Sequence, residues 1–184
     1  MHQALTEAFA ILDRSRAALR SAADAVPGVR RDQPLDDGRW SVAGIVEHIA
    51  LVDERFMGIL ATKIDEARAG HAGEEEDTPA RLPGEIENML ADRSERRQAP
   101  EPLHPTGITC EAAWARADTV RTAFRRLLAE AEDIPLGRVI HAHPRFGELS
   151  VYQWAGFLAG HETRHAQQIR EIAAPPGGRT NVVS

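Results

Sequence analysis

Two histidines spaced four residues apart, His161 and His165, are the strongest chemical feature of this chain. They belong to a His-Glu-x-x-His stretch with Glu162 between them. On a helix, residues four apart share one face with Cβ atoms about 6 Å apart, so both imidazoles can reach one metal ion. In zinc peptidases with this motif, the glutamate is the general base. The motif therefore predicts metal binding, with Glu162 as a catalytic residue, a group that orients a ligand, or the partner of an arginine.

The helix that must carry this pair has a clear apolar stripe, and both histidines fall on it. At about 100° per residue with Val151 set to 0°, Trp154 lies at about 300°. His161 lies at about 280° and His165 at about 320°, while Glu162 lies at about 20°, at the edge of the stripe. A buried imidazole needs a polar partner. A single histidine here would indicate a hydrogen-bonded core residue, whereas a pair on one stripe favours a shared metal ion.

A third ligand is needed, because zinc sites in proteins use three or four side chains. His48 is the best candidate. It lies in a second periodic segment, at about 240° when Val42 is set to 0° and the apolar stripe centres near 320°. Metal sites in helical bundles are built from facing helices. Three imidazoles leave positions for water or substrate, as in catalytic sites, and suit a divalent transition metal, with zinc or nickel favoured over iron or copper.

Other chemical candidates carry weaker signals. His141 and His143 form a His-x-His pair in a connection that contains proline and glycine. One of them could close over the site, although exposed loop histidines are the expectation. Cys110 is the only cysteine, so no disulfide can form within the chain. We expect Cys110 to be a small core or boundary residue rather than a nucleophile.

Four long segments with a helical period must position these residues. Their expected spans are residues 3–26, 41–69, 109–132 and 150–173. Ser41 is a good N-cap, and Ser150 with Gln153 forms a capping box. Residues 70–108 form a less regular connection with an acidic run at 74–77, several prolines and a short helix expected within 85–98.

These segments predict an all-α fold, a four-helix bundle without a series of strands. The long connection between the second and third helices would allow a crossover in place of simple up-and-down order. We expect a single domain over residues 1–174, followed by a disordered tail over residues 175–184.

Composition excludes several classes of function. The chain has 184 residues, 42% of them hydrophobic and 27% charged, which fits one globular domain. A net charge of −6 argues against nucleic-acid binding. Two arginine clusters, one around Arg93 and one around Arg121, are expected to form solvated faces. Neither a membrane-spanning run nor a signal peptide is found, so a cytoplasmic location is expected.

A wider set of residues carries a resemblance to a known family. Trp40 and Ser41 open the second segment seven residues before His48; Gly-Glu-Leu-Ser at residues 147–150 opens the last segment, and Gln-Ile follows the histidine pair at 168–169. In this order and spacing the chain resembles the DinB-like superfamily. The resemblance implies a four-helix bundle with a metal site made by His48, His161 and His165. Residues 70–108 match none of the family motifs.

The same resemblance implies a function. Members of the family are described as metal-dependent hydrolases, and some relatives use bacterial low-molecular-weight thiols as S-transferases or isomerases. The first hypothesis is thus a metal-dependent hydrolase or thiol S-transferase acting on a small molecule, with a homodimer as a further expectation. A non-catalytic metal-stabilised or partner-binding module stays open. A zinc peptidase is less favoured, because no third histidine continues the motif and no strands are expected to hold a peptide.

Overall fold

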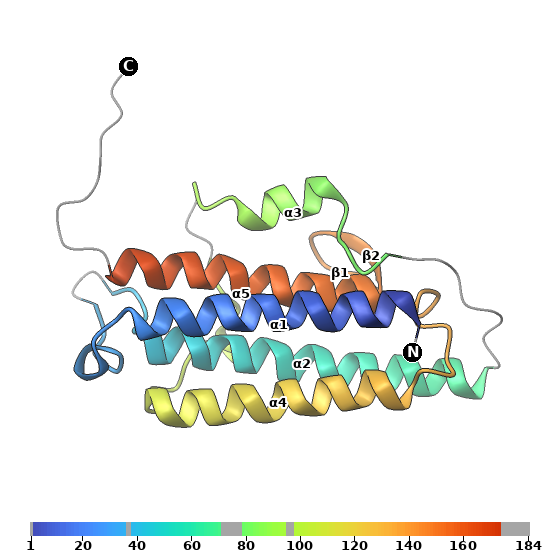
Figure 1. Cartoon of the computed structure of the whole chain (residues 1–184), viewed down its shortest axis with the longest axis horizontal. Coiled ribbons are helices and arrows are strands. Elements are labelled where there is room, and N and C mark those ends of the chain that lie inside the picture. The colour runs from blue at the N-terminus through green and yellow to red at the C-terminus, as the bar shows by residue number, and fades with distance from the viewer. Residues whose placement is uncertain (1, 36–37, 71–78, 95–97, 174–184) are drawn as a thin grey trace, which may run out of the picture.

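Four long helices lie side by side along the molecule, with a short helix and a small hairpin added at their sides (Figure 1). The computed structural model describes residues 2–35, 38–70, 79–94 and 98–173. The elements are α1 (Gln3–Asp24), η1 (Gly28–Arg30), α2 (Val42–Ala69), α3 (Gly84–Ala91), η2 (Glu101–Leu103), α4 (Cys110–Glu130), β1 (Ile140–His143), β2 (Gly147–Ser150) and α5 (Val151–Ala173). The predicted four-helix bundle is therefore confirmed.

The long helices begin where the sequence signals place them. The Ser41 hydroxyl accepts a hydrogen bond of 3.0 Å from a backbone N–H in the first turn of α2. Thr109 caps α4 in the same way at 3.2 Å. The predicted capping box opens α5, since the Ser150 N–H donates to Gln153 Oε1 at 3.0 Å and the Gln153 N–H donates to Ser150 Oγ at 3.2 Å. These caps satisfy N–H groups that the helix leaves unpaired.

The helices do not alternate in direction along the chain. In Figure 1, α1 runs from right to left, α2 and α4 both run from left to right, and α5 runs from right to left. The connection that contains α3 and η2 must therefore return along the whole bundle, so the crossover is present. Within the bundle, α1 packs along α5 and α2 packs along α4.

Two apolar clusters occupy opposite ends of the bundle. The first is built from residues on α1, α2, α4 and α5 such as Leu12, Leu60, Phe124 and Leu158. The second is built from the other ends of the same helices, with residues such as Leu19, Ile49, Ala117 and Ile169. Between the two clusters, along the length of the bundle, lie buried polar side chains such as Ser15, Asp53, Arg121 and Glu162. On α5, His161 and His165 also lie between the residues of the two clusters.

The segment 79–94, which contains α3, packs on the outer side of α5 (Figure 1). Two glycines of α5 allow this segment to lie directly against the helix. A Cβ at Gly156 would lie 2.5 Å from the carbonyl oxygen of Ala80, and a Cβ at Gly160 would lie 2.4 Å from Leu90 Cδ2. Arg164 donates to the carbonyl of Leu90 at 3.1 Å and so bonds the last turn of α3. The short helix is thus present, although it ends earlier than expected.

The hairpin is the main departure from the all-α prediction. Strands β1 and β2 pair antiparallel, with His143 opposite Gly147, which has φ of +76° and closes the turn. Each strand has only four residues, too few for alternation to stand out in the sequence. The fold is therefore mostly helical with one small hairpin. The acidic run 74–77 and the tail 175–184 lie outside the described residues.

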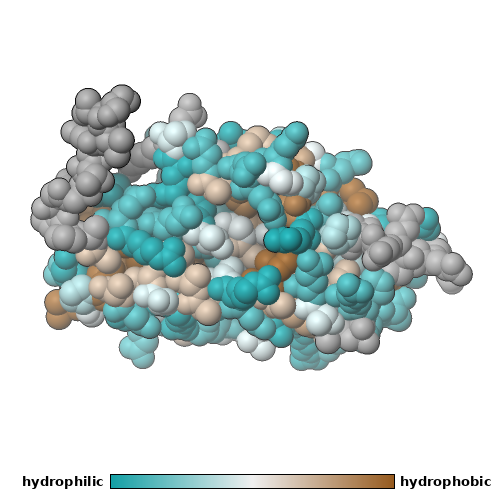
Figure 2. Space-filling view, turned by 45° about the horizontal axis from the view of Figure 1, so that its top comes forward, coloured by the Kyte–Doolittle hydropathy of each residue, from teal (hydrophilic) through white to brown (hydrophobic). Residues whose placement is uncertain are grey.

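The face shown in Figure 2 is mainly hydrophilic, and its strongly hydrophobic residues are scattered. Among the described residues, the large hydrophobic side chains that are exposed are Val29, Met89 and Ile140, which come from different elements. No helix in this part of the chain combines the length and the apolar character needed to cross a membrane.

Candidate metal centre

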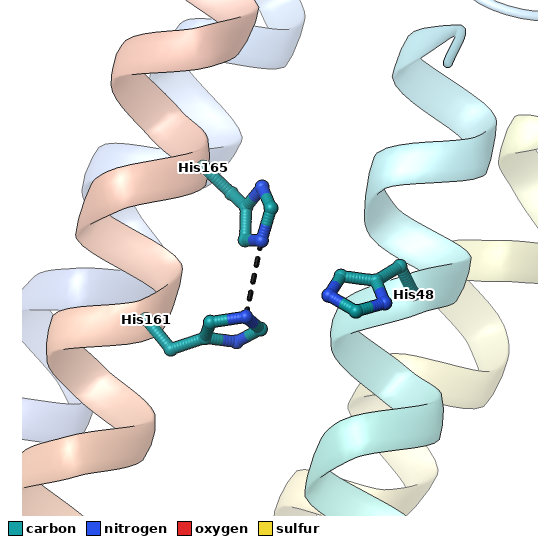
Figure 3. Close-up of side chains that lie close together, drawn as sticks. All are labelled: His48, His161 and His165. Carbon is teal, nitrogen blue, oxygen red and sulfur yellow. Dashed lines mark hydrogen bonds between the residues drawn. The ribbon is translucent and has the colours of Figure 1, made fainter. Parts of the chain in front are cut away.

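His48 lies in the second turn of α2, and its side chain is buried at 5% exposure. Its Nδ1 lies 2.8 Å from the carbonyl oxygen of Leu103. A carbonyl can only accept a hydrogen bond, so Nδ1 carries the proton and Nε2 is left with a free lone pair. Figure 3 shows this ring pointing across the gap between α2 and α5, toward the two other histidines. The Leu103 carbonyl thereby orients His48 in the way that carbonyls orient metal ligands.

His161 and His165 project from α5 toward His48 (Figure 3). Nδ1 of His165 lies 2.8 Å from Gln168 Oε1, which holds its proton and leaves Nε2 to face His161. The Nε2 atoms of His161 and His165 are 3.1 Å apart. The ring centroids lie 5.2 Å apart for His48 and His161 and 5.1 Å apart for His48 and His165. The structure therefore brings together the three residues named as ligands.

The donor set fits one divalent transition-metal ion. One nitrogen from each imidazole can be chosen so that all three lie within 4.8 Å of one another. A tetrahedral ion with bonds of about 2.05 Å holds its nitrogens about 3.3 Å apart, so only small side-chain adjustments are required. In the described part of the chain, Nδ1 of His161 is buried without a hydrogen-bond partner. Burial of unpaired imidazole nitrogens is costly, so a cluster of two buried histidines and one partly exposed histidine favours a bound cation.

All three imidazoles are held in the neutral form that binds metals. Burial lowers the pKa of His48, partly opposed by its hydrogen bond to Leu103. Burial together with repulsion from His165 and His48 lowers the pKa of His161 well below its ordinary value. Burial and repulsion from His48 lower the pKa of His165 to about 3. Protons therefore compete weakly for these nitrogens near neutral pH.

Glu162 is not brought to the three histidines. Its side chain is fully buried, and it points toward α1 and α4. Oε2 accepts a hydrogen bond of 2.5 Å from the Ser15 hydroxyl, and Oε1 accepts from Arg16 Nε at 2.8 Å. Arg121 Nη2 lies 2.9 Å from the same Oε1. Of the three roles predicted for Glu162, the structure shows the pairing with arginine.

Arg121 corrects one prediction. Its cluster was expected to form a solvated face, yet the Arg121 side chain is 8% exposed and pairs with Asp53 and Glu162. Its neighbours Arg125 and Arg126 are 35% and 77% exposed, as expected of a solvated face. In the other cluster, Arg93 is partly buried and pairs with Glu171 at 2.7 Å, while Arg96 and Arg97 lie outside the described residues. The arginine is drawn inward by two buried carboxylates, and periodicity alone does not reveal such partners.

His141 and His143 lie on β1 and do not belong to the three-histidine cluster. His143 is partly buried, and its ring centroid lies 4.6 Å from that of Phe157. Its Nδ1 accepts from the N–H groups of Arg145 at 3.0 Å and Phe146 at 3.2 Å, which stabilises the hairpin turn. Burial, together with the nearby charges of His141 and Arg145, lowers its pKa to about 4.

Sequence reasoning missed the groups that hold the ligands in place. Gln168 follows His165 by three residues, a spacing that allows contact on a helix, and this signal was available. Nothing in the sequence points to the backbone carbonyl of Leu103, because every residue has one. Glu47 was also missed: its carboxylate accepts from the Thr106 N–H at 2.9 Å, the Thr106 hydroxyl at 2.6 Å and the Gly107 N–H at 3.2 Å. These bonds fix residues 103–107 against α2, and so fix the carbonyl that orients His48.

Comparison with known proteins finds a matching family and a similar sequence. The model of the DinB superfamily matches residues 11–169. The uncharacterized protein YuaE of Bacillus subtilis (strain 168) is 29% identical over 135 residues, which is 72% of this chain and 76% of YuaE.

Two solved structures are similar in fold. TT2238, a four-helix bundle protein, is 23% identical with a TM-score of 0.51, and the match covers 91% of this chain and 98% of TT2238. YfiT from Bacillus subtilis, described as a probable metal-dependent hydrolase with an unusual four-helix bundle topology, is 17% identical with a TM-score of 0.54. That match covers 94% of this chain and 88% of YfiT. At these identities the similarity concerns the fold.

Proposed function

The chain belongs to the DinB superfamily, and we propose that it is a metal-dependent enzyme, a hydrolase or thiol S-transferase, acting on a small molecule. The single observation that carries the proposal is the convergence of His48, His161 and His165 from two helices. Their polar partners, the Leu103 carbonyl and the Gln168 side chain, hold two of the rings with a free nitrogen facing the centre. Such support is typical of metal ligands.

Three imidazoles would hold a divalent cation and leave at least one position free. When bound, the cation supplies a Lewis acid that makes a water molecule or a thiol nucleophilic near neutral pH. The protein's own part is to keep the imidazoles neutral and oriented. Trp40 and Phe157 contribute to this, since the Trp40 ring lies 4.9 Å from that of His48 and the Phe157 ring stacks 6.1 Å from that of His161. Both aromatic rings pack against imidazoles of the cluster.

Hydrolysis and S-transfer share this machinery and differ in the nucleophile. The fold similarity to YfiT, described as a probable metal-dependent hydrolase, supports the hydrolytic form. The sequence resemblance supports either form. A small-molecule substrate suits both, because the site lies between two helices, and the strands in the described residues form one hairpin with only four residues in each strand.

The peptidase alternative has little support from the site. A general base must come within hydrogen-bond reach of the nucleophile. Glu162 instead accepts hydrogen bonds from Ser15 and Arg16 and pairs with Arg121. A role in proton transfer would require all of these contacts to be broken. We therefore propose that Glu162 is not the base in this protein.

Metal analysis tests the proposal most directly. The protein would be purified without an affinity tag and its metal content measured by elemental analysis, for the unmodified chain and for single alanine variants of His48, His161 and His165. Each variant should lose most of the bound metal. His141→Ala is the matched control, since His141 lies on β1, outside the three-histidine cluster and outside residues 103–107. Full metal retention by all three ligand variants would refute the proposal.

Activity then separates the forms of the proposal. The metal-loaded protein would be tested against nitrophenyl esters and amides in water, and against small electrophiles with and without added bacterial thiols. Hydrolysis without thiol supports the hydrolase; turnover that requires the thiol supports the S-transferase. Metal binding with neither activity, in a protein that unfolds when the metal is chelated, would favour a metal-stabilised module instead.

A further inference from the structure

A charged layer crosses the bundle between its two apolar clusters. It contains one charged residue from each long helix: Arg16 on α1, Asp53 on α2, Arg121 on α4 and Glu162 on α5. The side chains of Asp53 and Glu162 are 3% and 0% exposed. Two positive and two negative groups balance one another. Buried ion pairs of this kind contribute little net stability compared with apolar residues, which favours a role in geometry.

Arg121 is the centre of this layer. A single nitrogen, Nη2, lies 3.1 Å from Asp53 Oδ2 and 2.9 Å from Glu162 Oε1. Its neighbour Nη1 donates to the carbonyl of Leu12 on α1 at 3.1 Å. One guanidinium group thus joins α4 to each of the three other long helices. A rigid planar fork is suited to this, because its donors stay at fixed angles to one another.

The two carboxylates bound by Arg121 lie close in sequence to the proposed metal ligands. Glu162 directly follows His161 and precedes His165 by three residues on α5. Asp53 follows His48 by five residues on α2, a rise of about 7.5 Å. These are the two helices whose histidines must face each other. They belong to different packed pairs, α1 with α5 and α2 with α4, and the direct contact between α2 and α5 is smaller than the contact within either pair, so an additional bridge between them can set their spacing.

We propose that Arg121 and Glu162 are positioning residues for the metal centre. The Asp53–Arg121–Glu162 bridge sets the spacing of α2 and α5 and the rotation of α5 about its axis. It thereby sets how His161 and His165 face His48. The inference rests on the proposed metal site and assigns the glutamate of the His-Glu-x-x-His motif a role toward α1 and α4 rather than at the metal.

A charge-balanced double variant, Arg121→Met with Glu162→Met, tests this role. It removes one positive and one negative group and leaves Arg16 and Asp53, which are 3.8 Å apart, to pair with each other. Apolar replacement of a buried ion pair usually preserves the fold. Co²⁺ titration should show affinity about 10- to 100-fold weaker than in the unmodified protein, with altered visible absorption bands, because the ligands lose their alignment.

The matched control is Arg116→Met with Glu54→Met. This pair also joins α4 to α2, but its side chains are 37% and 49% exposed. The control should keep the affinity and the spectrum of the unmodified protein. Circular dichroism and thermal melting of all variants separate loss of fold from loss of alignment.

The outcomes are distinguishable. If the unmodified protein takes up no Co²⁺, the metal centre itself is refuted. If it binds Co²⁺ and the folded double variant keeps the same affinity and spectrum, only the positioning role is refuted. Should the double variant fail to fold, Arg121→Met with Asp53→Leu decides, because it is also charge-balanced, leaves Arg16 paired with Glu162 at 2.8 Å and removes the bridge between α2 and α5. Weaker Co²⁺ binding with a changed spectrum in this second variant supports the role, and unchanged values overturn it.

Discussion

Replacing Gly156 by alanine should loosen the segment 79–94 from α5, whereas the same replacement at Gly160 should be tolerated. At Gly156 the new Cβ would lie 2.5 Å from the carbonyl oxygen of Ala80, a backbone atom that cannot move by itself. At Gly160 it would lie 2.4 Å from Leu90 Cδ2, the end of a side chain that can rotate. The two sites are one helical turn apart and differ in what the methyl group meets.

The magnitudes follow from two opposing effects. Alanine is favoured over glycine inside a helix by about 1 kcal/mol. Overpacking against atoms that cannot yield costs about 1–3 kcal/mol. Gly156→Ala should therefore destabilise the protein by up to about 2 kcal/mol, while Gly160→Ala should stay within about 1 kcal/mol of the unmodified chain. Gly58 on α2 has nothing within 4 Å of its added Cβ, so Gly58→Ala should stabilise by about 0.5–1 kcal/mol.

Urea denaturation followed by circular dichroism would give the three free energies of unfolding, and hydrogen exchange of the α3 amides would report local release. Metal affinity should stay unchanged in all three variants. With Val151 at 0°, Gly156 and Gly160 lie at about 140° and 180° on α5, on a different side from the histidines at about 280° to 320°. A Gly156→Ala variant as stable as Gly58→Ala, with α3 fully protected from exchange, would refute the reasoning.

Three further outcomes are expected. Glu47→Gln should destabilise the fold by about 2–4 kcal/mol in urea denaturation, because the backbone N–H groups of Thr106 and Gly107 lose a charged acceptor. Thr106→Val removes only the hydroxyl donor and should cost less in the same measurement. The pKa of His143 is about 4 in the folded state and 6.5 in the unfolded state. The unfolded state therefore binds a proton first, and the stability that the neutral His143 contributes is present above pH 6.5 and is lost as the pH falls toward 4. Urea midpoints of the unmodified protein should therefore fall more steeply over this range than those of His143→Phe, and parallel curves would contradict the assignment. Chelation should remove activity but retain the helical circular dichroism, because neither apolar cluster includes a metal ligand; a cooperative loss of helix on chelation would show a structural site instead.

The charged layer shows what helical periodicity in the sequence can predict and what it cannot. With Leu5 at 0°, Arg16 falls at about 20°, on the apolar stripe of α1, and Asp53 falls at about 20° on α2 when Val42 is at 0°. The pattern thus places both charges inside the bundle. It does not identify their partners, because that depends on which helices are neighbours and on their directions. Arg121 was expected in solvent for this reason.

Glu47 shows the opposite limit. It falls at about 140° on α2, directly across from the centre of the apolar stripe near 320°, so the pattern places it in solvent. It is nevertheless fully buried. Residues 103–107 cross this side of α2 and donate hydrogen bonds to its carboxylate. A helical wheel cannot anticipate a connecting segment that folds back over the polar face.

The sequence by itself determined the local features of this protein. Capping residues set where helices begin, apolar periodicity set their spans, and a spacing of four placed His161 and His165 on one face, because all three depend on neighbours within a turn or two of chain. The tertiary structure decided the rest: that His48 meets the pair, that the Leu103 carbonyl orients it, and that Glu162 turns toward Arg121. These contacts join residues many positions apart, and they exist only once the crossover has fixed the neighbours and directions of the four helices.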